Sequence, residues 1–426
     1  MALSGYRILV ASHTDRITSL FFDPYGPTLN VTSDIVVGSQ PMSIIGHPSN
    51  PSLAFTGLEQ EDGTVVALTF DETGNGTIAG EIPSGGAVAA SLLATTEALF
   101  VGNVSRNPAP VRHSFTDLVY VDALRKYNSG TVLAAPLSGS PPYFLDEDDS
   151  FVPPRTVLQL NGSGPNAARQ QSSHPHQVVA LPGRAEMLIP DLGADRAWRV
   201  MYDDRQGTLS VLGEVTYPPG SGPRHIVFHG LCPFRPTADR VPMVLMYTHT
   251  DDILYTVSEL TSNLFTHHLP PLPDPPTLLS TTSTLQLQPG EALGDRIAAE
   301  LLLAPPLATS ARNSNGSYGD RGARRTPFLY ATNRNDPSPE GDTVAIFSLD
   351  NRTAPVLVAE VHTGLRHLRG AAIGGEDGRW MVLGGMLGGG VKMYERVDGG
   401  RSIKEIAALP DIEGPTGFLW LTPRDQ

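Results

Sequence analysis

The chain has 426 residues, 40% of them hydrophobic and 17% charged, which is the composition of a globular protein that can bury a large core. Its formal net charge of -14 disfavours nucleic acid and anionic membrane surfaces as main partners. The single cysteine, Cys232, excludes an intrachain disulfide and a cysteine-rich zinc site.

The N-terminal residues show no basic region followed by an apolar run of signal-peptide length. No apolar stretch of the sequence has the length that a membrane-spanning helix needs. We therefore expect a soluble, cytoplasmic protein that does not bind a membrane.

A repeated pair of strands begins close to the N-terminus. Residues 7–12 form an apolar run, the polar turn HTDR follows, and an alternating run then ends at Asp23, as expected for a β-hairpin. The pattern returns six times, beginning at Leu53, Ala98, Glu186, Met243, Phe328 and Trp380. In the copy at Met243 we take MVLMYTH as the first strand, TDD as the turn and ILYTVSE as the second strand.

Further apolar runs precede several hairpins, as at residues 41–48 and 224–229, and we also assign residues 294–303 to a strand. A hairpin alone cannot bury its faces, so the copies must pack on one another. We predict an all-β fold, a single seven-bladed β-propeller over residues 1–426 with four-stranded antiparallel blades around a central channel.

Three insertions interrupt this repeat, near residues 105–126, 269–291 and 305–327. The first splits the third hairpin, the second connects the fifth and sixth blades, and the third separates the first two strands of the sixth blade. The second is rich in Pro, Ser and Thr, and the third in small and polar residues. Such compositions bury little apolar surface, so we expect mobile loops.

Three polar side chains in the repeat are candidates for chemistry. His176 follows a proline, and its imidazole suits proton transfer near neutral pH, although a structural hydrogen-bonding role is an alternative. Arg224 and Arg334 offer planar forks that bind carboxylate or phosphate. The alternative for both arginines is a salt bridge between blades, to Asp191 or Asp195.

The histidines of the same region raise the question of a metal. His174 and His176 are two residues apart and face the same side of a strand, and His225 and His229 form a second pair. No set of acidic ligands accompanies them, so we predict neither a metal site nor a cofactor.

Four sequence pieces together resemble one known family. SHPHQV, DLGADR, GPRHIVFH and the Asn-Arg after FLYAT are similar to motifs of the lactonase family of seven-bladed β-propellers. This family includes the propeller-type 6-phosphogluconolactonases of bacteria and the carboxy-cis,cis-muconate cyclases of fungi. The resemblance covers nearly the whole chain.

The resemblance implies a metal-free site at one mouth of the channel, lined by a histidine, two arginines and a glutamate. The matching residues are His176, Arg224 and Arg334, and His225 beside Arg224 is expected to contact substrate. The glutamate position falls in MYTHTDD, where His249 takes its place. We expect His249 to take over part of the glutamate's role.

The resemblance also implies a small anionic substrate and an enzyme that forms or opens a lactone without a metal. Because long insertions suit a fungal-type member, a carboxy-cis,cis-muconate cyclase is the first expectation. A 6-phosphogluconolactonase-like hydrolase is the alternative. The replacement of the family's glutamate by His249 adds a further alternative, a propeller that has lost catalysis and binds a ligand or a protein partner.

Overall fold

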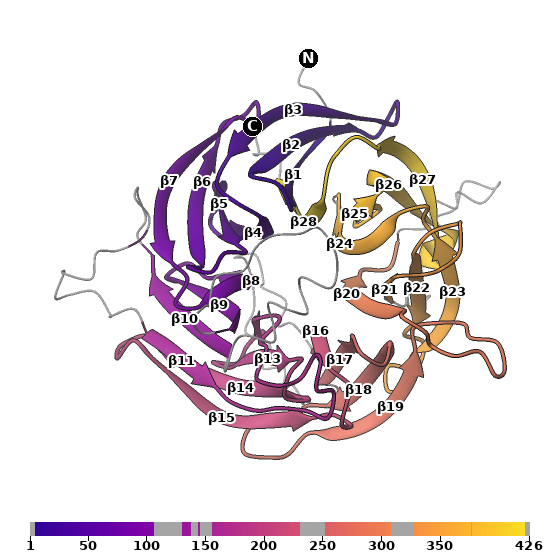
Figure 1. Ribbon diagram of the computed structural model, residues 1–426. Helices are drawn as coiled ribbons and strands as arrows, with labels where there is room; N and C mark the ends of the chain where they lie inside the picture. Colours follow the sequence, from indigo (N-terminus) through magenta and orange to yellow (C-terminus); the bar gives the residue numbers. More distant parts are fainter. Residues whose placement is uncertain are drawn as a thin grey trace, which may run out of the picture.

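The computed structural model describes residues 5–105, 130–137, 144, 156–230, 252–307, 327–375 and 377–421. Seven four-stranded antiparallel sheets stand around a common axis, which confirms the predicted seven-bladed propeller (Figure 1). Within these residues the helical structure is one short 3-10 turn, Asp398–Gly400, and no helix there is long and apolar enough to cross a membrane.

Each blade is an up-and-down sheet whose first strand lies nearest the axis and whose fourth lies at the rim. The first three blades comprise β28 (Pro415–Leu421), β1 (Tyr6–Ser12), β2 (Arg16–Asp23) and β3 (Thr28–Val36); β4 (Pro41–His47), β5 (Asn50–Leu58), β6 (Thr64–Phe70) and β7 (Gly76–Pro83); and β8 (Ala87–Ala94), β9 (Ala98–Ser105), β10 (Gly130–Pro136) and β11 (Thr156–Leu160).

The other four blades continue in the same order. They comprise β12 (Val179–Ala180), β13 (Met187–Asp191), β14 (Arg196–Asp203) and β15 (Thr208–Thr216); β16 (Pro223–His229), β17 (Ile253–Ser258), β18 (Asn263–His268) and β19 (Thr277–Ser283); β20 (Ile297–Ala304), β21 (Phe328–Arg334), β22 (Thr343–Ser348) and β23 (Val356–His362); and β24 (Arg366–Gly374), β25 (Trp380–Gly388), β26 (Gly390–Val397) and β27 (Ser402–Leu409).

The C-terminal strand closes the ring. β28 supplies the innermost strand of the blade that begins the chain and pairs antiparallel with β1, Leu9 lying opposite Leu419. The side chain of Thr416 donates a hydrogen bond to the carbonyl of Ala11, 3.2 Å away, across this junction. Both ends of the chain therefore belong to one blade (Figure 1).

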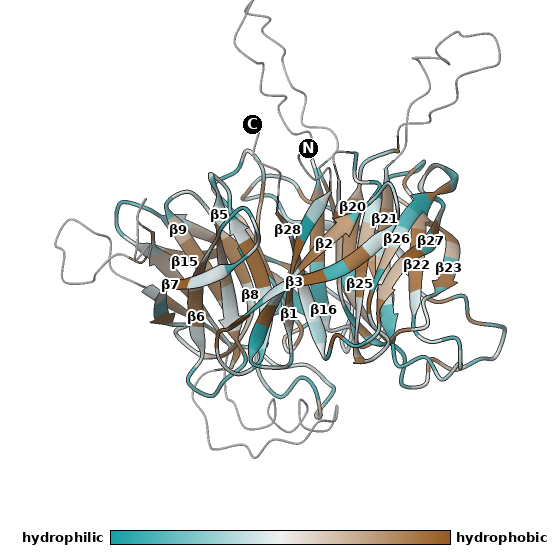
Figure 2. Cartoon of the chain, turned by 90° about the horizontal axis from the view of Figure 1, so that it is seen from above, coloured by the Kyte–Doolittle hydropathy of each residue, from teal (hydrophilic) through white to brown (hydrophobic). Residues whose placement is uncertain are grey.

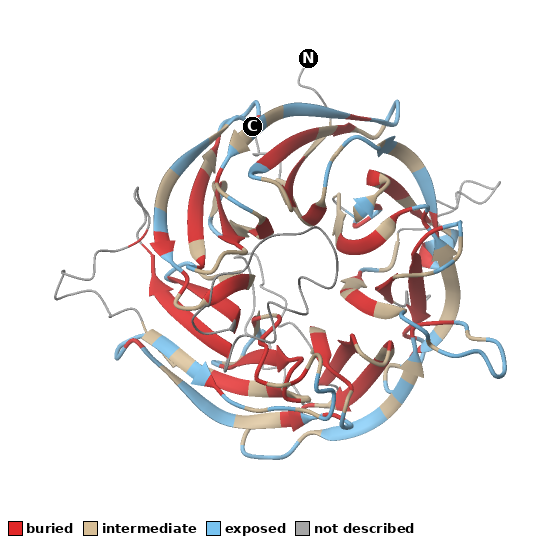
Figure 3. Ribbon diagram, in the orientation of Figure 1, coloured by how far each residue is buried: buried red, intermediate tan, exposed pale blue. Residues whose placement is uncertain are grey.

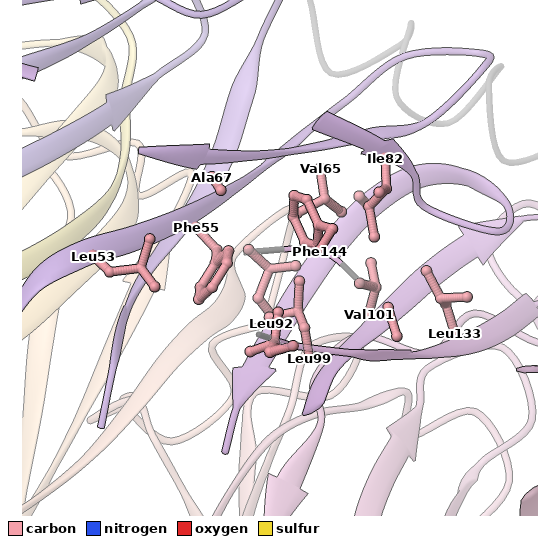
Figure 4. Packing of buried hydrophobic residues seen from close by; sticks show 13 residues of the cluster. Leu53, Phe55, Val65, Ala67, Ile82, Leu92, Leu99, Val101, Leu133 and Phe144 are labelled. Atoms are coloured by element: carbon pink, nitrogen blue, oxygen red, sulfur yellow. The ribbon is translucent and has the colours of Figure 1, made fainter. Parts of the chain in front are cut away.

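Apolar side chains between successive blades form the core. The middle strands β13, β17 and β21 are buried throughout, whereas the outer strand β3 alternates between covered and exposed residues (Figure 3). Hydrophobic stretches accordingly run along the strands, and hydrophilic loops edge the ring (Figure 2). Figure 4 shows one cluster, in which Phe55 and Val65 of one blade pack with Leu99 and Leu133 of the next.

The fifth hairpin differs from the prediction. β17 pairs with β18, from Ile253 opposite His268 to Ser258 opposite Asn263, so ILYTVS is the first strand of this hairpin and NLFTHH the second. The run MVLMYTH has the same apolar character but lies outside the described residues. Three successive apolar runs allow two pairings, and the sequence prediction selected the wrong one.

The predicted insertions also need one correction. Thr277–Ser283 forms β19, the outer strand of its blade, so residues 269–291 are not simply a connecting loop. Most of the other two insertions lies outside the described residues, at 106–129 and 308–326. The predicted inner strands at residues 41–48, 224–229 and 294–303 are confirmed as β4, β16 and β20.

Packing between blades predicts a stability effect. Phe55 is fully buried in the cluster of Figure 4, so Phe55→Ala removes its packing and leaves a cavity. We expect a loss of about 3–5 kcal/mol in the free energy of unfolding, measured by denaturant titration. Tyr25→Ala, at a side chain that is 80% exposed, is the control and changes stability by less than about 0.5 kcal/mol. Equal effects of the two substitutions would contradict this account of the core.

Candidate functional site

A buried carboxylate joins two adjacent blades and the segment that precedes β12. Glu259, which is 1% exposed, directly follows β17. One of its carboxylate oxygens, Oε2, lies 2.9 Å from Nε of Arg224 and 2.9 Å from Nη2 of Arg334. The other, Oε1, forms an ion pair with Arg169. These arginines come from β16, from the end of β21 in the next blade, and from the segment that precedes β12.

Backbone and side-chain partners fix the orientation of these guanidinium groups. Arg224 is the second residue of the inner strand β16, and its Nη1 donates to the carbonyl of Ala299 on β20, 2.5 Å away. Arg334 ends β21, and its Nη1 lies 3.1 Å from Nε2 of His367 on β24. Each arginine therefore contacts the inner strand of the following blade.

These pairs keep the buried groups charged. Burial raises the pKa of Glu259, but Arg169, Arg334, Arg224 and His176 outweigh it and hold this pKa well below its ordinary value of 4.5. Burial lowers the pKa of Arg334 to about 10, partly opposed by Glu259. Glu259 and Arg334 are therefore both ionised at neutral pH.

A fourth buried arginine adds to this positive charge. Arg369 on β24 is 5% exposed, and its charge contributes to lowering the pKa values of both Arg334 and His176. We call Arg169, Arg224, Arg334 and Arg369 the arginine cluster. Among the described residues, Glu259 forms ion pairs with Arg169, Arg224 and Arg334, and Oε1 of Glu300 on β20 lies 3.5 Å from Nη1 of Arg224.

Two neutral imidazoles lie beside the arginine cluster. The ring centroids of His176 and His225 are 5.3 Å apart. Nδ1 of His225 lies 2.7 Å from Oε2 of Glu300. Burial lowers the pKa of His176 well below 6.5, and Arg224 and His225 add to this effect. Burial also lowers the pKa of His225, against the opposing influence of Glu300. Both rings are therefore uncharged at neutral pH and able to accept a proton.

The structure brings together four of the residues selected from the sequence, His176, Arg224, Arg334 and His225. The fifth, His249, lies outside the described residues. A glutamate does lie beside the arginines, Glu259, which the sequence analysis did not select, and the role expected of His249 stays a prediction. Ser258-Glu259-Leu260 directly after a buried strand was the signal that could have located it.

The alternative partners proposed for the arginines have other roles. Asp191 accepts hydrogen bonds from the hydroxyl of Ser173 at 2.5 Å and from the indole nitrogen of Trp198 at 2.9 Å. Asp195 accepts from backbone nitrogens at Gly220 and Gly222. Arg224 and Arg334 do bridge blades, but through Glu259.

The remaining histidine of the His-Pro-His stretch has structural contacts. Nδ1 of His174 lies 3.0 Å from the carbonyl of Val104, and its backbone nitrogen donates to Asp191 at 2.7 Å. Across the described part of the chain, no group of three His, Cys, Asp or Glu side chains is arranged to hold a metal ion.

Comparison with known proteins identifies the family. A family model described as "Lactonase, 7-bladed beta-propeller" matches residues 126–420, which is more than half of the chain. The chain belongs to this lactonase family. Membership rests on the sequence match, and the seven-bladed fold agrees with it.

Relatives with assigned names cover parts of the chain. A protein of Arthroderma benhamiae described as a probable 6-phosphogluconolactonase is 27% identical over 267 residues, which are 62% of this chain and 58% of the relative. The 6-phosphogluconolactonase of Bacillus subtilis is 31% identical over 122 residues, or 29% of this chain and 32% of the relative. The chain thus spans less than two thirds of the length of either relative.

Solved structures share the fold over almost the full length. A putative 6-phosphogluconolactonase from Bacteroides fragilis aligns with a TM-score of 0.71 and 19% identity, covering 98% of each chain. A structure from Pseudomonas aeruginosa described as a periplasmic gluconolactonase aligns with a TM-score of 0.70 and 18% identity, covering 98% of this chain and 99% of the other. At these identities the likeness establishes the fold alone.

The buried ion pairs predict how Glu259 affects stability. Glu259→Gln leaves three guanidinium groups without their shared counter-ion, so we expect the free energy of unfolding at pH 7 to fall by about 3–5 kcal/mol. Denaturant titration measures this loss. Glu214→Gln, which breaks a partly exposed pair with Arg196, is the matched control with an effect below about 1 kcal/mol.

The pH dependence checks the cause of this loss. Because its pKa is depressed in the folded state, Glu259 stabilises the fold above pH 4.5, and this contribution disappears as the pH falls below 4.5 through the folded pKa. The difference in stability between wild type and Glu259→Gln should therefore narrow on acidification. A difference that stays constant down to acid unfolding would show that the charge of Glu259 is not its source.

Proposed function

We propose that the protein is a lactone hydrolase whose substrate is a small anionic sugar lactone of the 6-phosphogluconolactone type. The family match and the names of the relatives support lactone chemistry. They favour the hydrolase over the carboxy-cis,cis-muconate cyclase that was the first expectation. The ion pairs of Glu259 with Arg224 and Arg334 favour a retained catalytic site over a propeller that has lost catalysis.

The main support for the proposal is the convergence of two buried guanidinium groups, those of Arg224 and Arg334, on one carboxylate oxygen of Glu259. Removing a guanidinium group from water is unfavourable unless an anion compensates for it. Arg224 and Arg334 come from adjacent blades, so an anionic ligand between them would meet N–H donors from both. Nη2 of Arg224 has no acceptor among the described residues and remains available to such a ligand.

Phosphate or carboxylate suits this arrangement for a geometric reason. A guanidinium group presents parallel N–H donors that match two oxygens of either anion, and it stays charged at neutral pH. Glu259 holds Arg224 and Arg334 in fixed positions before substrate arrives. Binding then requires little reordering of long side chains, which improves affinity.

The same arrangement supplies the groups that lactone hydrolysis needs. Water adds to the ring carbonyl, and a neutral imidazole can take the proton that this water loses. The carbonyl oxygen becomes negative in the tetrahedral intermediate, where a neighbouring guanidinium stabilises it. The ring C–O bond then breaks, and the departing oxygen receives a proton to give the hydroxy acid. Each step uses side chains of this protein alone.

Activity is the direct test. We expect purified protein to release acid from 6-phosphogluconolactone well above the uncatalysed background, as measured by pH-stat titration. Arg334→Lys keeps a positive charge but loses the planar fork, so KM should rise at least about 10-fold. 3-Carboxy-cis,cis-muconate, followed by absorbance, tests the cyclase alternative.

Arg196→Lys is the control for this substitution. Arg196 pairs with Glu214 between β14 and β15, away from the arginine cluster, so its replacement by Lys should leave KM within about 2-fold of wild type. Turnover of muconate without turnover of the phosphorylated lactone would overturn the proposal in favour of the cyclase. Turnover of neither substrate would overturn it altogether.

A further inference from the structure

We propose that His225 and Glu300 form the general-base dyad of this site, with Nε2 of His225 taking the proton from the attacking water. The inference rests on the proposed lactone hydrolysis and identifies which of two neighbouring imidazoles performs it. His225 was expected only to contact substrate. Its geometry supports a larger role.

A hydrogen bond joins the side chains of His225 and Glu300. Nδ1 of His225 lies 2.7 Å from Oε2 of Glu300, and the two residues come from the inner strands β16 and β20 of adjacent blades. A carboxylate accepts but does not donate, so the proton must lie on Nδ1. This hydrogen bond therefore leaves a lone pair on Nε2, the form that a general base requires.

The ring nitrogens of His176 have different contacts from those of His225. Nδ1 of His176 is buried without a hydrogen-bonding partner, and neither of its ring nitrogens contacts a carboxylate among the described residues. Among the described residues, no comparable contact fixes its tautomer. The side chain of His225 is 13% exposed and its Nε2 has no partner in the described part of the chain, which would let water or substrate reach this nitrogen. The ring of His176 packs against that of His225, with the ring centroids 5.3 Å apart.

Arg224 contacts both Glu300 and Glu259. Its Nη1 lies 3.5 Å from Oε1 of Glu300 and its Nε lies 2.9 Å from Glu259, so it connects the dyad to the arginine cluster. An oxyanion beside Arg224 would thus form close to the base. The water oxygen bonds to the lactone carbonyl carbon, and the proton held on Nε2 then passes to the ring oxygen as its C–O bond breaks.

The charges around His225 define its expected pH behaviour. Glu300, Arg224, Glu259 and His176 all lie close to it, from β20, β16, the end of β17 and the segment before β12. Burial lowers the pKa of His225 below 6.5, Glu300 and Glu259 raise it, and Arg224 lowers it. The base is therefore neutral at pH 7, and on the acid side activity falls as His225 becomes protonated.

Two substitutions test the dyad. In His225→Gln we expect kcat for 6-phosphogluconolactone to fall about 100-fold or more, with KM within about 3-fold, because proton transfer is lost and the arginines remain. In Glu300→Gln we expect kcat to fall about 10-fold, and the acid limb of its pH profile to move to lower pH because the raising influence of Glu300 on the pKa of His225 is gone. A merely structural contact would not move this limb.

Matched controls lie in neighbouring parts of the fold. Glu214→Gln removes a carboxylate from an ion pair near the rim, and His268→Gln removes an imidazole from the third strand of the same blade as His225. Both should keep kcat within about 2-fold. Nitrogen NMR of the wild-type protein provides a test that needs no folded variant, since it should show His225 protonated at Nδ1 and not at Nε2.

The outcomes separate this inference from the proposed function. If wild type hydrolyses the lactone but His225→Gln stays within about 3-fold in kcat, the dyad is wrong and the hydrolase stands. The dyad is equally wrong if NMR finds the proton of His225 on Nε2, or if the acid limb of Glu300→Gln is unmoved. No turnover by wild type would remove the proposed function and the dyad with it.

Discussion

The ion pairs of Glu259 with three arginines are the interaction on which the site depends. Glu259 follows β17, and the arginines that contact it come from its own blade, from the following blade and from the segment before β12. A buried guanidinium without a counter-ion is strongly unfavourable, and one carboxylate shared by three of them compensates only in part. The same contacts therefore connect two adjacent blades with the segment before β12 and hold the guanidinium groups of Arg224 and Arg334 side by side.

The closed ring makes this arrangement possible. Because β28 completes the blade that contains β1, no blade is free to move away, and the inner strands keep fixed distances around the axis. Side chains at the beginnings of inner strands and at the ends of second strands then lie on one face of the propeller. Arg224 near the start of β16 and Arg334 at the end of β21 are examples. Residues far apart in sequence thereby form one preorganised site.

The alternating strands and recurring turns were sufficient to predict the seven-bladed fold, and the resemblance located His176, Arg224 and Arg334. Neither the strand pattern nor the resemblance led to Glu259. MVLMYTH, ILYTVS and NLFTHH are three successive apolar runs, and periodicity cannot decide which two of them form a hairpin. The structure decides it through the pairing of β17 with β18. The contact between His225 and Glu300 could not be predicted from the sequence either, because it depends on how adjacent blades align with each other.

The preference of the wild-type enzyme for a charged substrate is the most direct test of anion binding by the arginine cluster. The measurement is the ratio of kcat/KM for 6-phosphogluconolactone to kcat/KM for the unphosphorylated gluconolactone, which has the same ring but no anion. If the arginine cluster binds the anion, one charge-assisted bidentate contact of about 3 kcal/mol gives a ratio of at least about 100. A ratio near one, with both lactones hydrolysed, would contradict the account.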